Sequence, residues 1–389
     1  MKDASELRWS VRHAAFPPPA VAALLLGIAL TFSLTAFLQP MLVGDGGEYY
    51  AMYFAWKDTL RPFMTDASWS AVAGLAKSGE IAGFVTIEWL QEAFPALRVG
   101  ATSDFNHFWL YSAMAALVSG LASIIHIRLS AHAAFIVTHC LLFSLAAVIA
   151  WRHFQFKGLV GVVALFILSP MAWYVDKVHT EFFTFCLTLS AIVSFLSRNY
   201  ILSALFLAIA STQNISFAGV AAVPFAIHFL SPKSACHSRS SPASVAYAML
   251  ACLFILLHPL YYLSRYAVIT PQLLAGGAEV GVNASLMYVW LFDPDLGLLP
   301  NWPLGLAILF FSVLIYRSGK KSKEHAFLLL FFAAYLFINL LAQSSTSNLN
   351  SGATPGPARY GLWYIPLFFP LLLAVLDAAR DLRWLRIML

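Results

Sequence analysis

Charged residues are scarce in this chain of 389 residues. Asp, Glu, Lys and Arg together make up 11% of the sequence, whereas hydrophobic residues make up 60% and the mean hydropathy is +0.77. A soluble domain usually carries about 25% charged residues, because its surface must bind water. The composition therefore excludes an ordinary soluble protein of this size.

Cysteine is scarce as well. The four cysteines are scattered and show neither metal-ligand spacing nor a disulfide framework, so the sequence predicts neither a zinc module nor a disulfide scaffold. We expect them to be small buried hydrophobic residues. They are Cys140, Cys186, Cys236 and Cys252.

Long apolar runs take the place of the missing charge. Many are long enough to cross a hydrocarbon core of ~30 Å as a helix, and in lipid a helix satisfies its own backbone polar groups. We predict an all-α polytopic membrane protein with a bundle of about ten transmembrane helices. The expected spans are 20–38, 131–151, 158–175, 181–197, 200–212, 214–230, 243–263, 301–316, 326–342 and 361–377.

Lys and Arg gather in short clusters between the expected spans. Such clusters mark cytoplasmic loops, so we place both tails, 1–18 and 378–389, in the cytoplasm. The net charge of +5 therefore reflects membrane orientation and does not indicate a nucleic-acid partner. We expect a multi-pass protein of a bacterial inner (cytoplasmic) membrane, with any active site facing the periplasm or exterior. The clusters are Arg152, His153 and Lys157; Arg198; Lys233, His237 and Arg239; Arg317, Lys320, Lys321 and Lys323; and Arg380, Arg383 and Arg386.

The chain is expected to form one transmembrane domain over 1–389, with its helix bundle over 131–377. Residues 41–130 form the first extracytoplasmic loop, which is too polar to span and suits short amphipathic helices on the membrane surface. Within it, 108–127 is apolar enough to span, but a crossing there would reverse the side of every later loop. We therefore expect 108–127 to be re-entrant or interfacial, with an eleventh span as the alternative.

The apolar run 200–230 is too long for one crossing. At 1.5 Å per residue a single helix would be ~46 Å long. We predict two short helices joined at the polar tetrad 211–214, because broken helices are tolerated in membranes where they line protein or a wet cavity.

Polar residues at the outer ends of spans are the candidate functional residues, because ionisable groups at a membrane are costly. Asp45 and Glu48 follow the first span and share one helical face. Together they suit a general base, or a base with a metal ligand. The alternative is a capping box, with Asp45 as the N-cap of a helix.

Three further groups lie at the same side. In the segment 176–181, Lys177 or His179 could bind a phosphate and Glu181 could orient an acceptor; the alternative is a solvated turn with Thr180 as N-cap. At the tip of the predicted helix pair, Gln213 and Asn214 could bind sugar hydroxyls, or simply satisfy their own turn.

Arg359 stands alone at the outer mouth of the last span. A guanidinium there suits a phosphate diester, which it can bind bidentately. The alternative is an arginine that extends its charge to the membrane interface.

Taken in order, these motifs resemble the GT-C superfamily of membrane glycosyltransferases, which use polyprenyl-phosphate sugars. The resemblance covers roughly residues 20–380. One departure is the absence of the soluble C-terminal domain that members often carry, so we expect a minimal member or a partner subunit for acceptor recognition. The segments that carry the resemblance are Gly44–Tyr50, Asp176–Glu181, Ser211–Asn214, Leu291–Pro300 and Arg359–Tyr360.

The resemblance implies an inverting transfer from a polyprenyl-phosphate sugar to a glycan, lipid or protein acceptor. The lipid tail of the donor would lie in hydrophobic grooves between the spans, in contact with membrane lipid. Asp45 would be the general base, and Glu48 would assist through the acceptor or through a divalent cation (Mg or Mn) bound by both carboxylates. Arg359, with Lys177 or His179, would hold the donor phosphate. Aromatic residues beside these groups would contact sugar rings or belong to the interfacial belt; they are Tyr49, Tyr50, Trp173 and Tyr360.

Three rival functions use the same residues. A transporter or flippase of lipid-linked glycans would show internal repeats and mid-membrane polar residues, and the sequence shows neither. A polymerase of lipid-linked glycans does not explain the early acidic motif at Asp45. A non-catalytic assembly subunit is compatible with every motif named above.

Overall fold

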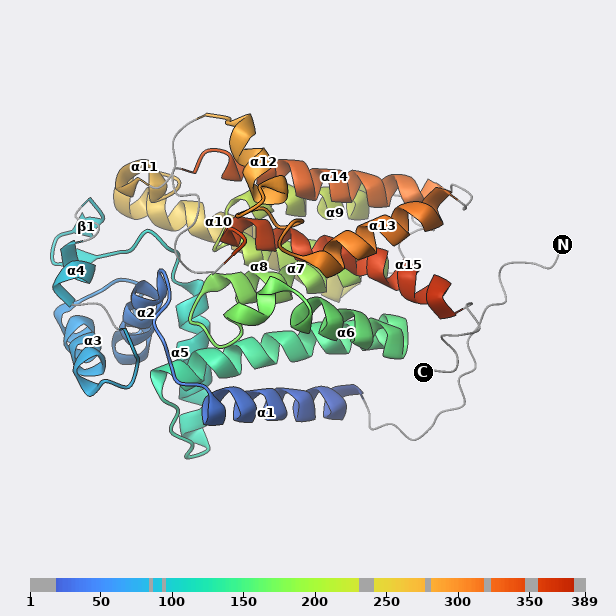
Figure 1. Ribbon diagram of the computed structural model, residues 1–389. Helices are drawn as coiled ribbons and strands as arrows, with labels where there is room; N and C mark the ends of the chain where they lie inside the picture. The colour runs from blue at the N-terminus through green and yellow to red at the C-terminus, as the bar shows by residue number, and fades with distance from the viewer. Residues whose placement is uncertain are drawn as a thin grey trace.

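The computed structural model describes residues 19–83, 87–92, 96–230, 241–276, 281–317, 323–346 and 356–380. Over these residues the chain is mostly helical, as predicted. Long helices lie side by side along one direction, and short helices gather at one end of them (Figure 1).

The long helices lie at the predicted spans. They are α1 (Pro19–Phe37), α6 (Ala131–Ile167), α7 (Thr180–Leu196), α8 (Tyr200–Ser211), α9 (Ser216–Leu230), α10 (Pro242–Tyr266), α13 (Pro303–Arg317), α14 (Lys323–Gln343) and α15 (Phe369–Arg380), preceded by the 3-10 helix η3 (Arg359–Phe368). In the described part of the chain, three helices are long and apolar enough to cross a membrane, and seven are apolar but shorter. Membrane character is therefore supported, and the count of ten spans stays a prediction.

Helix α6 combines two of the predicted spans. Gln155 has non-helical backbone angles (φ 53°, ψ −145°) between the two halves. The Nδ1 of His139, in the first half, donates to the carbonyl of Val175, beyond the second half, at 2.8 Å. The chain therefore reverses at Gln155, and the two halves lie side by side (Figure 1).

The second half of α6 ends earlier than the expected span 158–175. It stops at Ile167, and the 3-10 helix η1 (Pro170–Tyr174) follows. Pro170 has no backbone N–H and restricts the residue before it, so it cannot continue the α-helix. Ser169 caps η1 by accepting from the Met171 N–H at 3.2 Å.

The apolar run 200–230 is two helices, as predicted. Helix α8 ends at Ser211 and α9 begins at Ser216, with the polar tetrad between them. His258, on α10, donates from Nδ1 to the carbonyl of Thr212 at 2.8 Å and so fixes this turn against a third helix.

Short elements cover one end of the bundle. The described residues between 41 and 109, which we call the cap, form α2 (Gly46–Thr59), α3 (Asp66–Ser78), α4 (Ile87–Glu92) and the antiparallel strands β1 (Arg98–Val99) and β2 (Thr102–Ser103). Two more short helices, α11 (Gln272–Ala275) and α12 (Ala284–Phe292), follow α10. Helical elements in the first outer loop were predicted, and the structure contains them.

Helix α5 (Leu110–Ile124) lies crosswise to α1 and α6 (Figure 1). Its Tyr111 and Ala115 are buried, whereas Leu117, Leu121 and Ile124 are exposed. A crosswise helix of 15 residues would extend only ~23 Å at 1.5 Å per residue. Its expected place at the membrane interface stays a prediction that this geometry favours.

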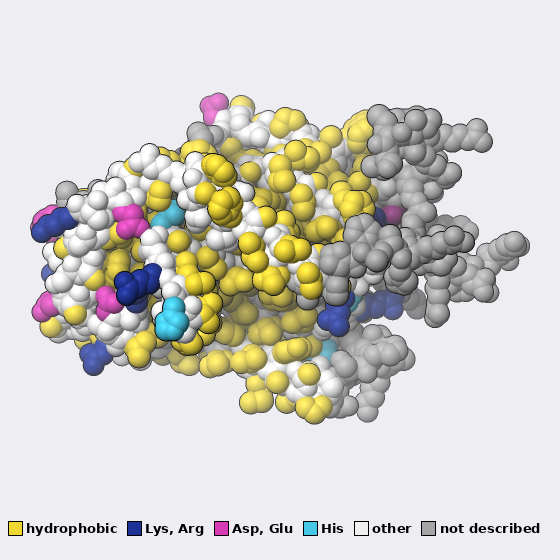
Figure 2. Space-filling view, turned by 90° about the horizontal axis from the view of Figure 1, so that it is seen from below, with side chains coloured by type: hydrophobic (Ala, Val, Ile, Leu, Met, Phe, Trp, Pro, Cys, Tyr) yellow, Lys and Arg dark blue, Asp and Glu magenta, His cyan; other side chains and the backbone are white. Residues whose placement is uncertain are grey.

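Large apolar side chains face outward along the bundle. Phe32 on α1, Phe310 on α13 and Phe337 on α14 are all exposed by 60% or more. Figure 2 shows this apolar surface between the cap, which carries charges of both signs, and Lys and Arg side chains toward the other end. Water solvates apolar side chains poorly, so an apolar zone of this kind suits contact with lipid.

Candidate functional site

Asp45 lies at the first turn of α2, where glycine allows close packing. A Cβ on Gly46 would come within 3.1 Å of the Val178 carbonyl, a tight contact, so glycine lets α2 begin directly against the segment 176–181 without displacing it. Asp45 occupies the N-cap position, but its side chain makes no capping hydrogen bond. The alternative of a capping box with Glu48 is therefore wrong, and the Asp45 carboxylate is directed elsewhere.

The Asp45 carboxylate contacts Arg359, 314 positions later in the chain. Arg359 donates from Nη1 to Asp45 Oδ2 at 2.5 Å and to His179 Nε2 at 3.2 Å, and from Nη2 to the hydroxyl of Tyr360 at 3.1 Å. Only 8% of Arg359 is exposed. The interpretation of Arg359 as an arginine reaching for the interface is therefore wrong.

The loop before η3 sets the position of Arg359. The Ala358 N–H donates to the carbonyl of Leu296 at 2.7 Å. A Cβ on Gly361 would meet the carbonyl of Trp290 at 2.7 Å, so this residue must be small. Segment 290–298 therefore braces the backbone on both sides of Arg359.

His179 connects Arg359 to Glu181. It occupies the N-cap position of α7, so the expected cap at Thr180 is wrong. Its Nδ1 lies within hydrogen-bonding distance of Glu181, which accepts the proton, and Nε2 then accepts from Arg359. This arrangement requires a neutral imidazole. Burial lowers the pKa of His179 to about 4, in agreement with that state.

His107 completes the cluster and was not predicted from the sequence. Its Nδ1 lies 2.9 Å from Glu48 Oε2 and its Nε2 lies 3.3 Å from Asp45 Oδ2. Burial alone would lower the pKa of His107, but Asp45 and Glu48 raise it above its usual value. A single histidine 59 residues after Glu48 has no spacing pattern that sequence reasoning could detect.

The pKa values of the two carboxylates shift in opposite directions. Burial opposes ionisation of Asp45, but Arg359, His107 and His179 outweigh it, so the pKa of Asp45 lies well below its usual value. Burial raises the pKa of Glu48 above its usual value, and the charge of Asp45 adds to that rise. The side chain of Asp45 is 22% exposed and that of Glu48 is 5% exposed. Asp45 is therefore the more exposed of the two carboxylates, and its ionised form is the better stabilised.

Asp45, Glu48 and His107 could hold a metal ion. One ligand atom from each lies within 4.8 Å of the others. Two carboxylates and one imidazole form a softer ligand set than the all-oxygen shell that Mg²⁺ prefers. Of the two cations expected from the sequence, the set therefore fits Mn²⁺ better than Mg²⁺.

Tyr49 and Tyr50, two of the predicted aromatic residues, have different surroundings. Tyr49 packs its ring on His107 and His179, with ring centroids 5.4 and 6.0 Å apart, and is fully buried. Its hydroxyl lies 3.3 Å from Thr180 Oγ1. Tyr50 pairs instead with His132 on α6, at 2.9 Å. Tyr49 is thus a wall of the cluster, and Tyr50 belongs to the packing behind it.

Lys177 is held away from the Arg359 cluster by a pair of its own. Its Nζ donates to the neighbouring Asp176 at 2.5 Å and lies 4.7 Å from the centre of the Trp173 ring. The structure therefore does not place Lys177 beside Arg359, where a shared phosphate site would need it. Trp173 is likewise occupied by Lys177.

The tip between α8 and α9 contacts α7 next to the cluster. Asn214 donates from Nδ2 to Thr184 Oγ1 at 3.4 Å, about one helical turn after Glu181. The Nε2 of Gln213 is buried and has no hydrogen-bond partner among the described residues. Of the two amides, Gln213 is the one with an unused donor.

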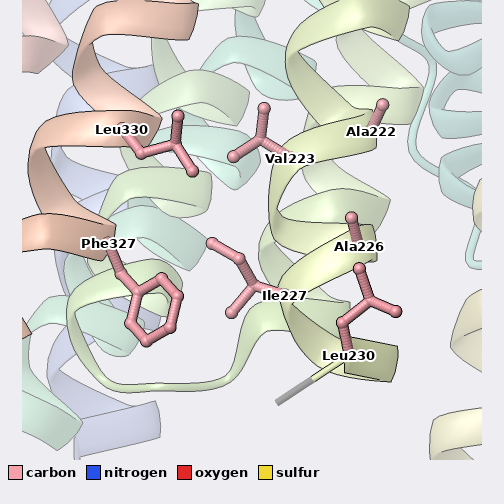
Figure 3. A pocket seen from close by; sticks show the side chains of 7 residues that line it. All are labelled: Ala222, Val223, Ala226, Ile227, Leu230, Phe327 and Leu330. Atoms are coloured by element: carbon pink, nitrogen blue, oxygen red, sulfur yellow. The ribbon is translucent and has the colours of Figure 1, made fainter.

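A cavity of about 440 Å³ lies elsewhere, between α9 and α14. The labelled side chains in Figure 3 are all apolar: five come from the second half of α9, and the other two, Phe327 and Leu330, face them from α14. The cavity carries no group that could perform acid–base chemistry, so it is not part of the site. Its lining residues are Ala222, Val223, Ala226, Ile227, Leu230, Phe327 and Leu330.

Compared with known proteins, the chain matches no protein-family model, no curated protein and no solved structure. The geometry and charge of the cluster formed by Asp45, Glu48, His107, His179 and Arg359 are therefore the basis for a functional assignment.

Proposed function

We propose that this protein is a glycosyltransferase that moves a sugar, with inversion, from a polyprenyl-phosphate donor to a hydroxyl group of a glycan, lipid or protein acceptor. The observation that carries the proposal is the contact of Asp45 with Arg359 at 2.5 Å. It joins an acid after the first apolar helix to a cation before the last one, at the end of the bundle that carries the cap.

Arg359 is the proposed site for the donor phosphate. Its Nη1 is used by Asp45 and His179, but its Nε has no hydrogen-bond partner among the described residues, and Oε1 of Glu181 is 3.9 Å away from it. A buried guanidinium with an unused donor suits a bidentate phosphate. It would also stabilise the phosphate that leaves, as charge develops on it in a partly dry site.

Asp45 is the proposed general base. The acceptor oxygen attacks the anomeric carbon, the bond from that carbon to the phosphate oxygen breaks, and the phosphate leaves with the electron pair. The acceptor proton passes to the Asp45 carboxylate. While Arg359 is bonded to Asp45 the pKa of that carboxyl is held low, so a donor phosphate that draws on the charge of Arg359 would make Asp45 a stronger base.

A divalent cation held by Asp45, Glu48 and His107 would supply additional positive charge to the acceptor and phosphate oxygens. Without it, His107 supplies a proton between the same two carboxylates, at 2.9 and 3.3 Å. Glu48, which is nearly fully buried, would hold His107 in place in either case.

The proposed location is a bacterial inner membrane, with the cluster facing the outer side. The clusters of Lys and Arg in the sequence favour this orientation, and the apolar surface of the bundle supports a place in lipid. The tail of the donor would lie along that apolar surface.

The test is sugar release from a panel of labelled polyprenyl-phosphate sugars by the purified protein. Asp45→Asn removes the base while keeping the side-chain shape, and we expect a loss of about 1,000-fold in rate with lipid binding kept. Asp377→Asn is the matched control, because Asp377 is an exposed carboxylate paired with Lys157. Absence of turnover on every donor, with lipid still bound, would instead favour a transporter or an assembly subunit.

A further inference from the structure

The segment that carries His107 is held by the end of α10, more than 150 residues later in the chain. Tyr262 places its hydroxyl 3.2 Å from the carbonyl of Phe105 and 3.2 Å from the carbonyl of His107. Tyr262 is 1% exposed, so these contacts are shielded from bulk water. Tyr262 therefore fixes the backbone from which the imidazole of His107 extends.

A second set of contacts holds the same segment at Asp104, three residues before His107. Asp104 is buried and accepts from Arg265 Nε at 2.7 Å, from the hydroxyl of Tyr261 at 2.5 Å and from the hydroxyl of Tyr266. We call this set of contacts on Asp104 the clasp. The carboxylate of Asp104 therefore accepts from three donors at one helix end. Hydrogen bonds to a charged group are strong, so they fix Asp104 against α10.

Helix α11 adds a third attachment. Gln272 donates from Nε2 to the carbonyl of Asn106 at 3.3 Å, and Asn106 donates from Nδ2 to the carbonyl of Gly276 at 3.5 Å. Every residue from Asp104 to His107 is thus bonded to the end of α10 or to α11. Among the hydrogen bonds of the described residues, those from the end of α10 reach the cluster only through the segment that carries His107.

We infer that Tyr262 is a positioning residue for His107: its hydroxyl, supported by the clasp, sets where the imidazole stands between Asp45 and Glu48. The inference rests on the proposed function for its effect on rate. It matters there because a displacement of about 1 Å at a reacting centre can cost about 100-fold in rate. It predicts that a change at α10 alters the turnover step while leaving the phosphate contact of Arg359 in place.

The experiment compares Tyr262→Phe with Tyr247→Phe. Both remove one hydroxyl from α10, but Tyr247 lies near the other end of the helix, beside an apolar cluster around Ala251. For Tyr262→Phe we expect kcat for sugar transfer to fall about 10-fold, with KM within about twofold of the parent, and for Tyr247→Phe neither to change. An unchanged kcat, or a KM that rises in step with the loss of kcat, would overturn the inference.

A second measurement does not depend on sugar transfer. In protein carrying isotope-labelled histidine, the NMR signal that disappears in His107→Gln belongs to His107. We expect Tyr262→Phe to shift that signal, and Tyr247→Phe to leave it in place. An unmoved signal in a folded Tyr262→Phe protein would refute the positioning role, whether or not the protein transfers sugar.

The two measurements separate the inference from the proposed function. A shifted His107 signal in a protein that transfers no sugar from any donor would refute the proposed function and keep Tyr262 as the residue that positions His107. Asp104→Asn is the second variant, because it weakens the clasp without removing a hydrogen bond to His107. We expect it to move the His107 signal in the same direction as Tyr262→Phe, and by less; a larger movement would mean that the clasp, and not Tyr262, sets the position.

Discussion

Two of the ion pairs that join distant parts of the described chain lie at opposite ends of the bundle. Arg359 and Asp45 meet at the end that carries the cap, at 2.5 Å, with side chains 10% and 22% exposed. Lys157 and Asp377 meet at the other end at 2.7 Å, with side chains 33% and 57% exposed. The distances are alike, but the surroundings are not.

The difference lies in the number of partners and in access to water. Arg359 also donates to His179 and Tyr360, and Asp45 also faces His107. An exposed pair is screened by water and contributes little, whereas a buried pair leaves an uncompensated charge if one partner is removed. Distance alone does not identify a site; burial together with further polar partners does.

The largest contrast is expected on removing the cation from each pair. Arg359→Met leaves the Asp45 carboxylate without its main partner, so we expect the free energy of unfolding to fall by about 3 kcal/mol and binding of polyprenyl phosphate to be lost. Lys157→Met should lower it by less than about 0.5 kcal/mol. Unfolding in detergent and lipid retention measure both, and equal effects of the two variants would break the comparison.

The next contrast concerns histidines. His107→Gln removes the group between Asp45 and Glu48, and we expect sugar transfer to fall about 10-fold to 100-fold, as for other residues that hold a reacting group in place. His126→Gln is the matched control, because His126 is exposed in the loop after α5. Rate assays under one donor concentration measure both, and a loss in His126→Gln of similar size would count against a special role of the cluster.

The pH dependence of stability sharpens the same comparison. The folded-state pKa of His107 is raised from 6.5, because Asp45 and Glu48 outweigh the opposing effect of burial. The contribution of protonated His107 to stability is therefore complete below a pH of about 6.5, and it is lost as the pH rises through the raised pKa. We expect the melting temperature to fall over that range in the parent protein and to change less in His107→Gln; parallel curves would argue against a protonated His107.

Asp45 gives the opposite dependence in acid. Its folded-state pKa lies well below 3.8, because Arg359, His107 and His179 outweigh its burial. The contribution of ionised Asp45 to stability is complete above a pH of about 4, and it is lost only as the pH falls further. The parent should therefore lose stability in strong acid more steeply than Asp45→Asn, and thermal unfolding at low pH checks this.

The smallest effect is expected from salt. A higher ionic strength screens the interaction between exposed charges, so the small contribution of the Lys157–Asp377 pair to stability should decrease. The Arg359–Asp45 pair should respond less, because it is buried. The measurement is the loss of stability, relative to the parent, that Lys157→Met and Arg359→Met each cause at low and at high salt. A loss for Arg359→Met that depends strongly on salt would show that the Arg359–Asp45 pair is more open to solvent than the structure has it.

Most helix positions could be predicted, because the thickness of a membrane fixes the length of an apolar run. Helix α7 was expected at 181–197 and lies at Thr180–Leu196. The break in 200–230 was marked by four consecutive polar residues. The early end of α6 was missed, because its stop depends on one proline within a run that is apolar on both sides.

The site was predictable only in part. Asp45, Glu48, His179 and Arg359 could be selected because each is polar at the end of an apolar run, and the structure brings them together. Lys177 satisfied the same criterion, but it is paired with Asp176. The sequence alone does not show which carboxylate a lysine will pair with. His107 depends on contacts from α10, and no local pattern records those.

The separation of 314 positions between Asp45 and Arg359 also sets an order of events during synthesis. At about 5–20 residues per second, the ribosome needs roughly 15–60 s to reach Arg359 after it has made Asp45. Glu48 and then His107 are made early in that interval, whereas the guanidinium comes only at its end. The cluster therefore cannot be complete in any nascent chain that stops before its last helix, and a truncated product would carry the acid without the cation.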